Sequence, residues 1–222
     1  MLGAIGSAIP IAIGIAISPI ALAAFMIVLI SPRARVNAPT FLLGWLLGIL
    51  IVGLLAYFIP GMETSRDKPG QLAGIVRLVL GLTLLFLALR QYRSYATSGK
   101  AKSRRFLNRI VNMNKGHCLL IGLLLTAGHP KNLPLIVAGV AAIARYNLDT
   151  FSELLTFLIF AIAASSTLAV PMAVSFAARN RSEIIFSRWK NWLIEKNDII
   201  VLILLVIFGM LLVGRGLKIL TA

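Results

Sequence analysis

The chain has 222 residues, of which 59% are hydrophobic and only 13% are charged, and its mean hydropathy is +0.94. Because this composition provides too little polar surface to cover a water-soluble globule of this size, it excludes a soluble domain and indicates an integral membrane protein. The net charge of +15 would suggest a nucleic-acid partner in a soluble protein. In a membrane protein it matters through the distribution of Lys and Arg between loops, so no nucleic-acid partner is expected.

Continuous apolar stretches predict six transmembrane helices, because about 20 helical residues suffice to cross a bilayer. They fall at 4–30, 39–59, 71–89, 117–144, 154–177 and 198–214. Strands of a β-barrel would instead alternate in polarity over about 10 residues, so the predicted class is an all-α membrane protein. Most of the 22 Lys and Arg residues lie in connections 31–38, 90–116 and 178–197. These connections are expected on the inner side of the cytoplasmic membrane, with both termini outside.

The first predicted span contains Pro10 and then Ser18 and Pro19 within its apolar residues. Proline has no backbone N–H and clashes with the preceding turn of a helix. A break at membrane depth is tolerated only where protein or a water-filled cavity satisfies the released backbone groups. The sequence therefore predicts a first helix that is broken at Pro19.

The fourth predicted span carries the sequence His129-Pro130-Lys131-Asn132 between apolar residues. An ionisable group at this depth normally faces a cavity or a partner and marks function. We therefore predict a second broken helix, at Pro130, and a site between the two breaks. Its predicted substrate-binding residues are Ser18, Pro19, His129, Pro130, Lys131 and Asn132. The alternative is a simple proline kink with Lys131 extended to the membrane interface.

The spacing of prolines suggests an internal duplication. Pro130 follows Pro19, and Pro171 follows Pro60, by half of the 222-residue chain. Three spans in each half would place the halves in opposite senses in the membrane, which predicts two inverted three-helix repeats. The expected organisation is a first repeat at 1–89, a basic cytoplasmic loop with an amphipathic helix at 90–116, and a second repeat at 117–222.

Other polar or small residues interrupt the spans. Ser165 and Ser166, in the fifth span, are added to the predicted substrate-binding residues, although their hydroxyls can instead satisfy backbone groups near Pro171. Arg77 is expected to extend outward to the interface, the alternative being a buried role. In the second span, Gly44 and Gly48 form the spacing of small residues that is typical of close helix packing.

Two basic amphipathic segments are predicted at the cytoplasmic interface, within 100–115 and 185–193. Basic residues near such an interface attract anionic lipids. The predicted lipid-head-group residues are Arg104, Arg105, Arg109 and Arg188. The alternative is that these residues only set the orientation of the chain in the membrane.

The chemistry of the predicted spans favours an anionic ligand. None of the seven acidic residues lies in the interior of a predicted span, so the partner of Lys131 must be backbone carbonyls, water or a ligand. A site for Ca²⁺, Mn²⁺ or Mg²⁺ would need oxygen ligands, and no His/Cys cluster or phosphate-binding loop is present. We predict no metal, no cofactor and no enzymatic activity.

Four motifs taken in order resemble those of the glycopeptidolipid- and sulfolipid-addressing proteins of actinobacteria, which belong to the lysine-exporter (LysE) superfamily. They are Ser18-Pro19-Ile20, Ser31-Pro32-Arg33-Ala34-Arg35, Gly44-Trp45-Leu46-Leu47-Gly48 and Pro130-Lys131-Asn132-Leu133. The resemblance covers the whole chain and implies a transport or export role for envelope lipids. The chain departs from the expected pattern at His129, where the family would have an asparagine.

The predicted function is therefore export of an anionic lipid or glycolipid, or of a lipid-linked glycan, across the cytoplasmic membrane. Two alternatives stay open: an exporter of small solutes of the amino-acid type, and a non-transporting subunit of a larger lipid exporter. Apart from the bilayer and the lipid, the expected partners are further copies of the chain or a larger lipid-export machinery.

Overall fold

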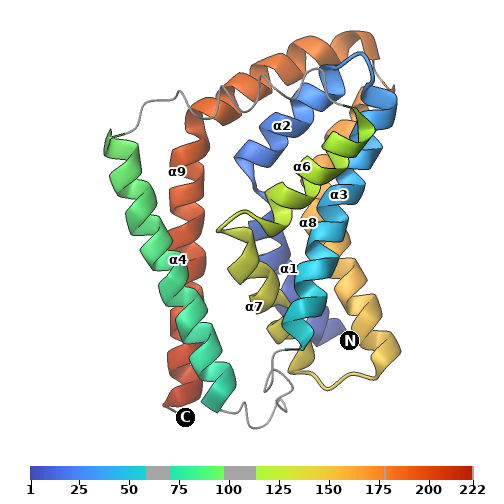
Figure 1. Cartoon of the computed structure of the whole chain (residues 1–222). Helices are drawn as coiled ribbons and strands as arrows, with labels where there is room; N and C mark the ends of the chain where they lie inside the picture. The colour runs from blue at the N-terminus through green and yellow to red at the C-terminus, as the bar shows by residue number, and fades with distance from the viewer. Residues whose placement is uncertain (59–70, 98–113, 178, 222) are drawn as a thin grey trace.

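The computed structural model describes the chain except for residues 59–70, 98–113, 178 and 222 (Figure 1). Its described part is helical and contains no strand. The helices are α1 (Leu2–Ala16), α2 (Pro19–Ile30), α3 (Ala34–Tyr57), α4 (Gln71–Thr97), α6 (Lys115–Ala127), α7 (Asn132–Ala144), α8 (Thr150–Ala177) and α9 (Arg179–Leu220). The predicted all-α class is confirmed.

The helices account for the predicted spans. Four of them, α3, α4, α8 and α9, are each long and apolar enough to cross a membrane. Two further spans are bent pairs: α1 and α2 meet at 63°, and α6 and α7 meet at 69°. Counting each pair as one span gives six, so the prediction of broken first and fourth spans is confirmed.

The breaks form where the chain loses helical hydrogen bonds. Pro19 is the first residue of α2, a position where its missing N–H is not needed. After α6, the N–H of Gly128 still bonds to Leu124 O at 2.8 Å, and Pro130 stands in the turn that follows. By contrast, Pro39 and Pro171 lie inside α3 and α8 without ending them. Proline alone therefore does not decide where these spans break.

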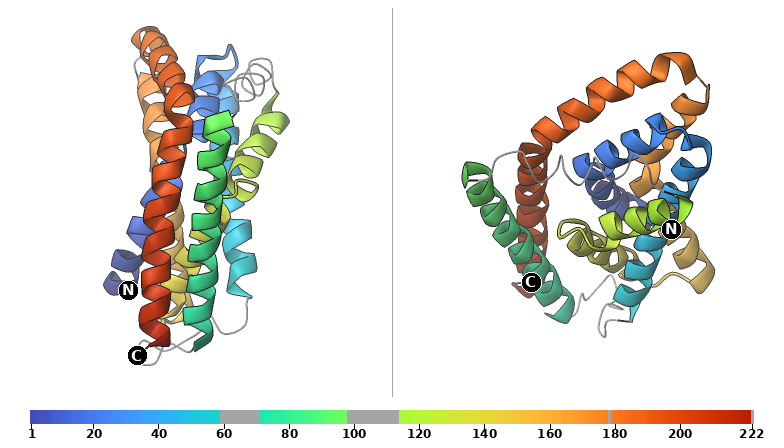
Figure 2. Two further views of the ribbon diagram at one scale, coloured as in Figure 1. Left: turned by 90° about the vertical axis from the view of Figure 1, so that its left-hand side faces the viewer. Right: turned by 45° about the horizontal axis from the view of Figure 1, so that its top comes forward.

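The bundle is held by close approach between helices. A Cβ atom on Gly44 of α3 would lie 2.0 Å from the carbonyl oxygen of Leu119 in α6, so only glycine fits there. On the side of the bundle formed by α4 and α9, which run side by side (Figure 2), a Cβ on Gly81 would lie 2.9 Å from Gly209 O. The predicted packing role of the Gly44–Gly48 pair agrees with the contact of Gly44 and with that of Gly48, where a Cβ would lie 2.7 Å from Thr126 Cβ.

The helices that extend furthest beyond their predicted bounds are α4 and α9. Helix α4 continues past residue 89 to Thr97, since interfacial basic residues do not interrupt helical hydrogen bonding. Helix α9 joins the predicted interfacial segment 185–193 to the last span as one helix of 42 residues, because neither Pro nor Gly occurs between Arg179 and Phe208. Its first part crosses one end of the bundle and its second part runs alongside α4 (Figure 1).

Candidate functional site

The two broken spans are joined by Lys131. Its ammonium donates to Gly14 O at 2.8 Å and to Ile17 O at 2.7 Å. Both carbonyls lie at the end of α1, where the break removes their partners in the next helical turn. The negative end of the helix dipole also favours a cation there. With only 2% of its surface exposed, Lys131 does not extend to the interface, and backbone carbonyls are its partners.

A third carbonyl at the end of α1 is bound from α8. The hydroxyl of Thr167 donates to Ala16 O at 2.6 Å, and the same oxygen accepts the N–H of Ser18 at 2.8 Å. Sequence analysis did not include Thr167 among the site residues. The run Ser165-Ser166-Thr167 could have indicated it. In a helix these three consecutive side chains point in different directions, so one of them can face α1 while the others do not.

The second break is closed by its own residues. The backbone N–H of Lys131 donates to His129 Nδ1 at 3.3 Å. The carbonyl of His129 accepts the N–H groups of Asn132 at 2.9 Å and Leu133 at 3.4 Å. The side-chain amide of Asn132 donates to Leu125 O, at 3.2 Å, near the end of α6.

The hydrogen bond to His129 resembles one that an asparagine can form at the same position. An Asn side chain in a turn accepts the backbone N–H two residues later, which is the geometry of an Asx-turn. His129 Nδ1 accepts the N–H of Lys131, which is also two residues later. His129 thus makes, through an unprotonated Nδ1, the hydrogen bond that an asparagine would make in this turn.

The predicted serines of α8 divide between two environments. Ser165 is buried and donates to Ala161 O at 2.7 Å, and Ser166 is exposed and donates to Ala163 O at 2.8 Å, both within α8. Neither hydroxyl reaches the breaks. Ser166 nevertheless lines a cavity together with Thr167.

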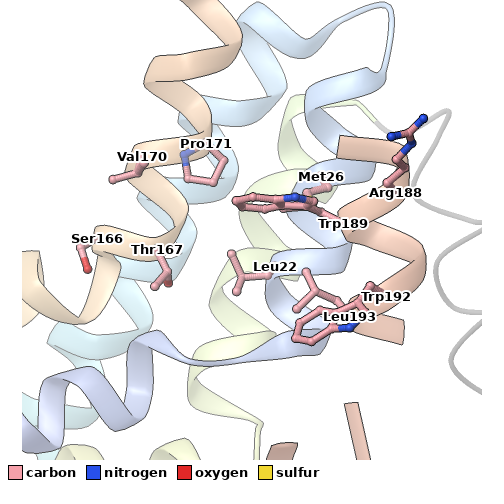
Figure 3. A pocket seen from close by; sticks show the side chains of 10 residues that line it. All are labelled: Leu22, Met26, Ser166, Thr167, Val170, Pro171, Arg188, Trp189, Trp192 and Leu193. Atoms are coloured by element: carbon pink, nitrogen blue, oxygen red, sulfur yellow. The ribbon is translucent and has the colours of Figure 1, made fainter. Parts of the chain in front are cut away.

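This cavity, which we name the α2–α8–α9 cavity, has a volume of about 810 Å³. It lies between α2, the second half of α8 and the first part of α9 (Figure 3). Its lining residues are Leu22, Met26, Ser166, Thr167, Val170, Pro171, Arg188, Trp189, Trp192 and Leu193. Most of this lining is apolar, whereas Arg188 brings a positive charge and the two tryptophans bring amphipathic rings.

The cavity has two different ends. Figure 3 shows Arg188 at one end, with its guanidinium turned away from the apolar wall, and Ser166 and Thr167 at the other. Trp189 extends from α9 toward the side chains of α2 and α8. Of the four arginines predicted to bind lipid head groups, Arg188 is the one that the structure places at the α2–α8–α9 cavity. Arg104, Arg105 and Arg109 lie outside the described residues.

The prediction that Arg77 extends outward is wrong. Its side chain is buried, with 6% exposed, and its guanidinium lies 3.5 Å from Ala141 O near the end of α7. The end of a short helix offers the arginine a negative partner inside the bundle, and this contact competes with the interface. Arg77 therefore packs against the second broken span.

These features define a multi-pass helical membrane protein with two broken spans, a cationic link between them and a large apolar cavity at one end. Comparison with known families then identifies the chain further. The family model described as Sap, sulfolipid-1-addressing protein, matches residues 9–218. The chain belongs to this family, which confirms the resemblance found in the sequence. No curated protein and no solved structure matches the chain.

Proposed function

We propose that this protein exports an anionic envelope lipid or lipid-linked glycan across the cytoplasmic membrane and binds it in the α2–α8–α9 cavity. Membership of the sulfolipid-1-addressing family implies a role in lipid export. The observation that carries the proposal is the cavity itself, about 810 Å³ in volume, which combines an apolar wall with Arg188 at one end.

The composition of the cavity fits an anionic amphiphile. Acyl chains would contact Leu22, Met26 and Val170, while the tryptophans would lie at the boundary between chains and head group, where such rings are favoured. A guanidinium can form two parallel hydrogen bonds to a sulfate, phosphate or carboxylate. A small polar amino acid would leave most of this wall without a complementary partner, so the wall favours a lipid over a small solute.

We also propose that the two halves, 1–89 and 117–222, form inverted repeats. The two bent helix pairs, at 63° and 69°, support the proposal because each begins one half of the chain. The concentration of Lys and Arg in the connections 31–38, 90–116 and 178–197 supports an orientation with both termini outside. The α2–α8–α9 cavity would then open near the cytoplasmic side, where newly made lipid is available.

The test uses the tryptophans as reporters. Trp189 and Trp192 line the cavity, and Trp45, the third tryptophan of the chain, is fully buried elsewhere. Protein carrying Trp45→Phe would be reconstituted into phosphatidylcholine vesicles containing a lipid with brominated acyl chains. Quenching by brominated phosphatidylglycerol should exceed quenching by brominated phosphatidylcholine, because only the first has an anionic head group.

The matched variants are Arg188→Gln and Lys190→Gln, which remove the same charge from neighbouring positions of α9, only one of which lines the cavity. Arg188→Gln should abolish the preference for the anionic lipid, and Lys190→Gln should preserve it. Equal quenching by both lipids in the Trp45→Phe protein with Arg188 intact would refute the binding proposal.

Translocation of a fluorescent anionic lipid across the membrane of the same vesicles tests export. Binding without translocation would favour the accessory-subunit alternative.

A further inference from the structure

We infer that the amino-terminal end of α2 is a binding subsite for a tetrahedral oxyanion, a sulfate or phosphate group, next to the inner end of the α2–α8–α9 cavity. The inference rests on the proposed function where it takes the oxyanion to be part of a lipid head group. It assigns the head group a second position in addition to Arg188.

The first observation is a set of unused backbone donors. Helix α2 is 12 residues long and begins with Pro19, which has no N–H. In the described part of the chain, no acceptor bonds to the N–H of Ile20 or Ala21, and the Ser18 side chain does not cap them. The first turn of a helix carries a partial positive charge, and its free N–H groups are suited to bind anions.

The second observation is a buried hydroxyl without a partner. Ser18 is the N-cap residue of α2 and is only 1% exposed, and its Oγ forms no hydrogen bond among the described residues. A buried hydroxyl in this state is destabilising unless a ligand or water pairs with it. Ser18 therefore offers an O–H donor beside the free N–H groups of α2.

Lys131 adds a basic side chain at the same place. Its ammonium is 2.7 Å from the carbonyl oxygen of Ile17, the residue that precedes Ser18. An ammonium has three donors, and two of them are used by Gly14 and Ile17. Among the described residues no acceptor bonds to the third donor, which leaves it for an anion at the start of α2.

The second break offers no equivalent subsite. At the start of α7, the N–H groups of Asn132 and Leu133 both bond to His129 O, and Pro134 has no N–H. Among the described residues, free N–H groups therefore occur at the start of α2 and not at the start of α7.

The subsite lies beside the proposed lipid cavity. Leu22 lines the cavity, and its backbone N–H bonds to Ser18 O at 2.9 Å. Thr167 also lines the cavity, and its hydroxyl bonds to Ala16 O, two residues before Ser18. A head group that leaves Arg188 along the cavity would thus meet the start of α2 at the opposite end.

The test observes the α2 amides directly. Protein labelled with ¹⁵N at Ile and Ala would be placed in phosphatidylcholine nanodiscs and titrated with inorganic sulfate, with chloride at equal ionic strength as the reference. The amide signals of Ile20 and Ala21 should shift in a saturable manner. In Ser18→Ala, binding should weaken about tenfold, as expected for the loss of one hydrogen bond to a charged group.

Ser165→Ala is the matched control, because Ser165 is also a buried serine but its hydroxyl bonds within α8. It should bind sulfate like the unmodified protein. Ser18→Ala should fold, since it removes a hydroxyl that has no partner, and its thermal unfolding would be compared with that of Ser165→Ala. Equal shifts in Ser18→Ala and the unmodified protein would overturn the inference.

A second titration, with a sulfated glycolipid added to the nanodiscs, distinguishes the source of the oxyanion. Shifts with the glycolipid but not with inorganic sulfate would support a head-group subsite, and shifts with both would support a general oxyanion subsite. No shift with either would refute the subsite. If the vesicle experiment shows no lipid preference but inorganic sulfate still shifts these amides, the lipid proposal fails and the subsite stands for a free anion.

Discussion

Lys131 and Ile17 are linked by a 2.7 Å hydrogen bond from ammonium to carbonyl, although they lie 114 positions apart in the chain. The bond, together with the one to Gly14, places a cation at the end of a helix that stops inside a span. A buried ammonium is normally expected beside a carboxylate. Here the helix end provides the negative partner, so the two broken spans support each other.

Replacing Lys131 should therefore change stability as well as function. In Lys131→Met, the carbonyls of Gly14 and Ile17 lose their side-chain partner, which costs about 1–3 kcal/mol for each buried group. Removing a buried charge offsets part of this loss. We expect a folded protein that is less stable by about 2 kcal/mol, measured as a lower unfolding temperature in detergent micelles. Lys115→Met, at an exposed position, is the control, and a Lys131→Met protein of unchanged stability would contradict the proposed link.

Thr167 should contribute through its hydroxyl. Thr167→Val preserves the shape of the side chain but removes the 2.6 Å hydrogen bond to Ala16 O. We expect a loss of about 1 kcal/mol, typical of one intramolecular hydrogen bond. Thr83→Val is the matched control, because the hydroxyl of Thr83 bonds within α4 to Val79 O and is exposed. If both variants melt at the same temperature, Thr167 does not support the break.

His129→Asn should be tolerated. An asparagine can accept the N–H of Lys131 as His129 Nδ1 does, so we expect the unfolding temperature at pH 7 to stay close to that of the unmodified protein. His129→Leu cannot accept this bond and should lose about 1 kcal/mol. Thermal unfolding of the two variants provides the comparison. Greater damage from Asn than from Leu would mean that the ring, and not its acceptor, is required.

The close contact of α3 with α6 makes Gly44 intolerant of a side chain. A Cβ atom there would lie 2.0 Å from Leu119 O, a backbone atom, so Gly44→Ala must displace one of the helices. We expect a loss of about 1–3 kcal/mol, as for other overpacked positions. Gly6→Ala in α1 is the control, since a Cβ there meets nothing within 4 Å. It should be neutral or stabilising by up to about 1 kcal/mol, and unfolding in detergent would measure both variants.

The sequence was sufficient to predict the helical class and the six apolar spans, because apolar length acts locally. The breaks at Pro19 and Pro130 were predicted from proline together with the polar residues beside it, since Pro39 and Pro171 stay inside their helices. The sequence also limited the partners of Lys131 to carbonyls, water or a ligand, since the predicted spans contain no acid. It did not indicate which carbonyls these are. Ile17 and Gly14 become neighbours of Lys131 only when the two halves pack, and a contact across 114 or 117 positions leaves no local pattern in the sequence.

The wrong orientation expected for Arg77 and the omission of Thr167 have the same physical reason. Whether a long basic side chain extends outward or inward depends on what the neighbouring helix offers, and for Arg77 this is Ala141 O of α7. Thr167 resembled its two serine neighbours in sequence, but it alone donates to α1. The α2–α8–α9 cavity could not be predicted from the sequence either, because its walls come from helices that include distant parts of the chain.

Helix α9 connects this cavity with the rest of the bundle. The same unbroken helix supplies Arg188, Trp189 and Trp192 to the cavity wall and Leu205 and Phe208 to the core. The second part of this helix packs against α4 where Gly81 meets Gly209 and leaves no room for a side chain. One continuous helix thus forms part of the cavity wall and also packs against α4, so the two places share a single structural element.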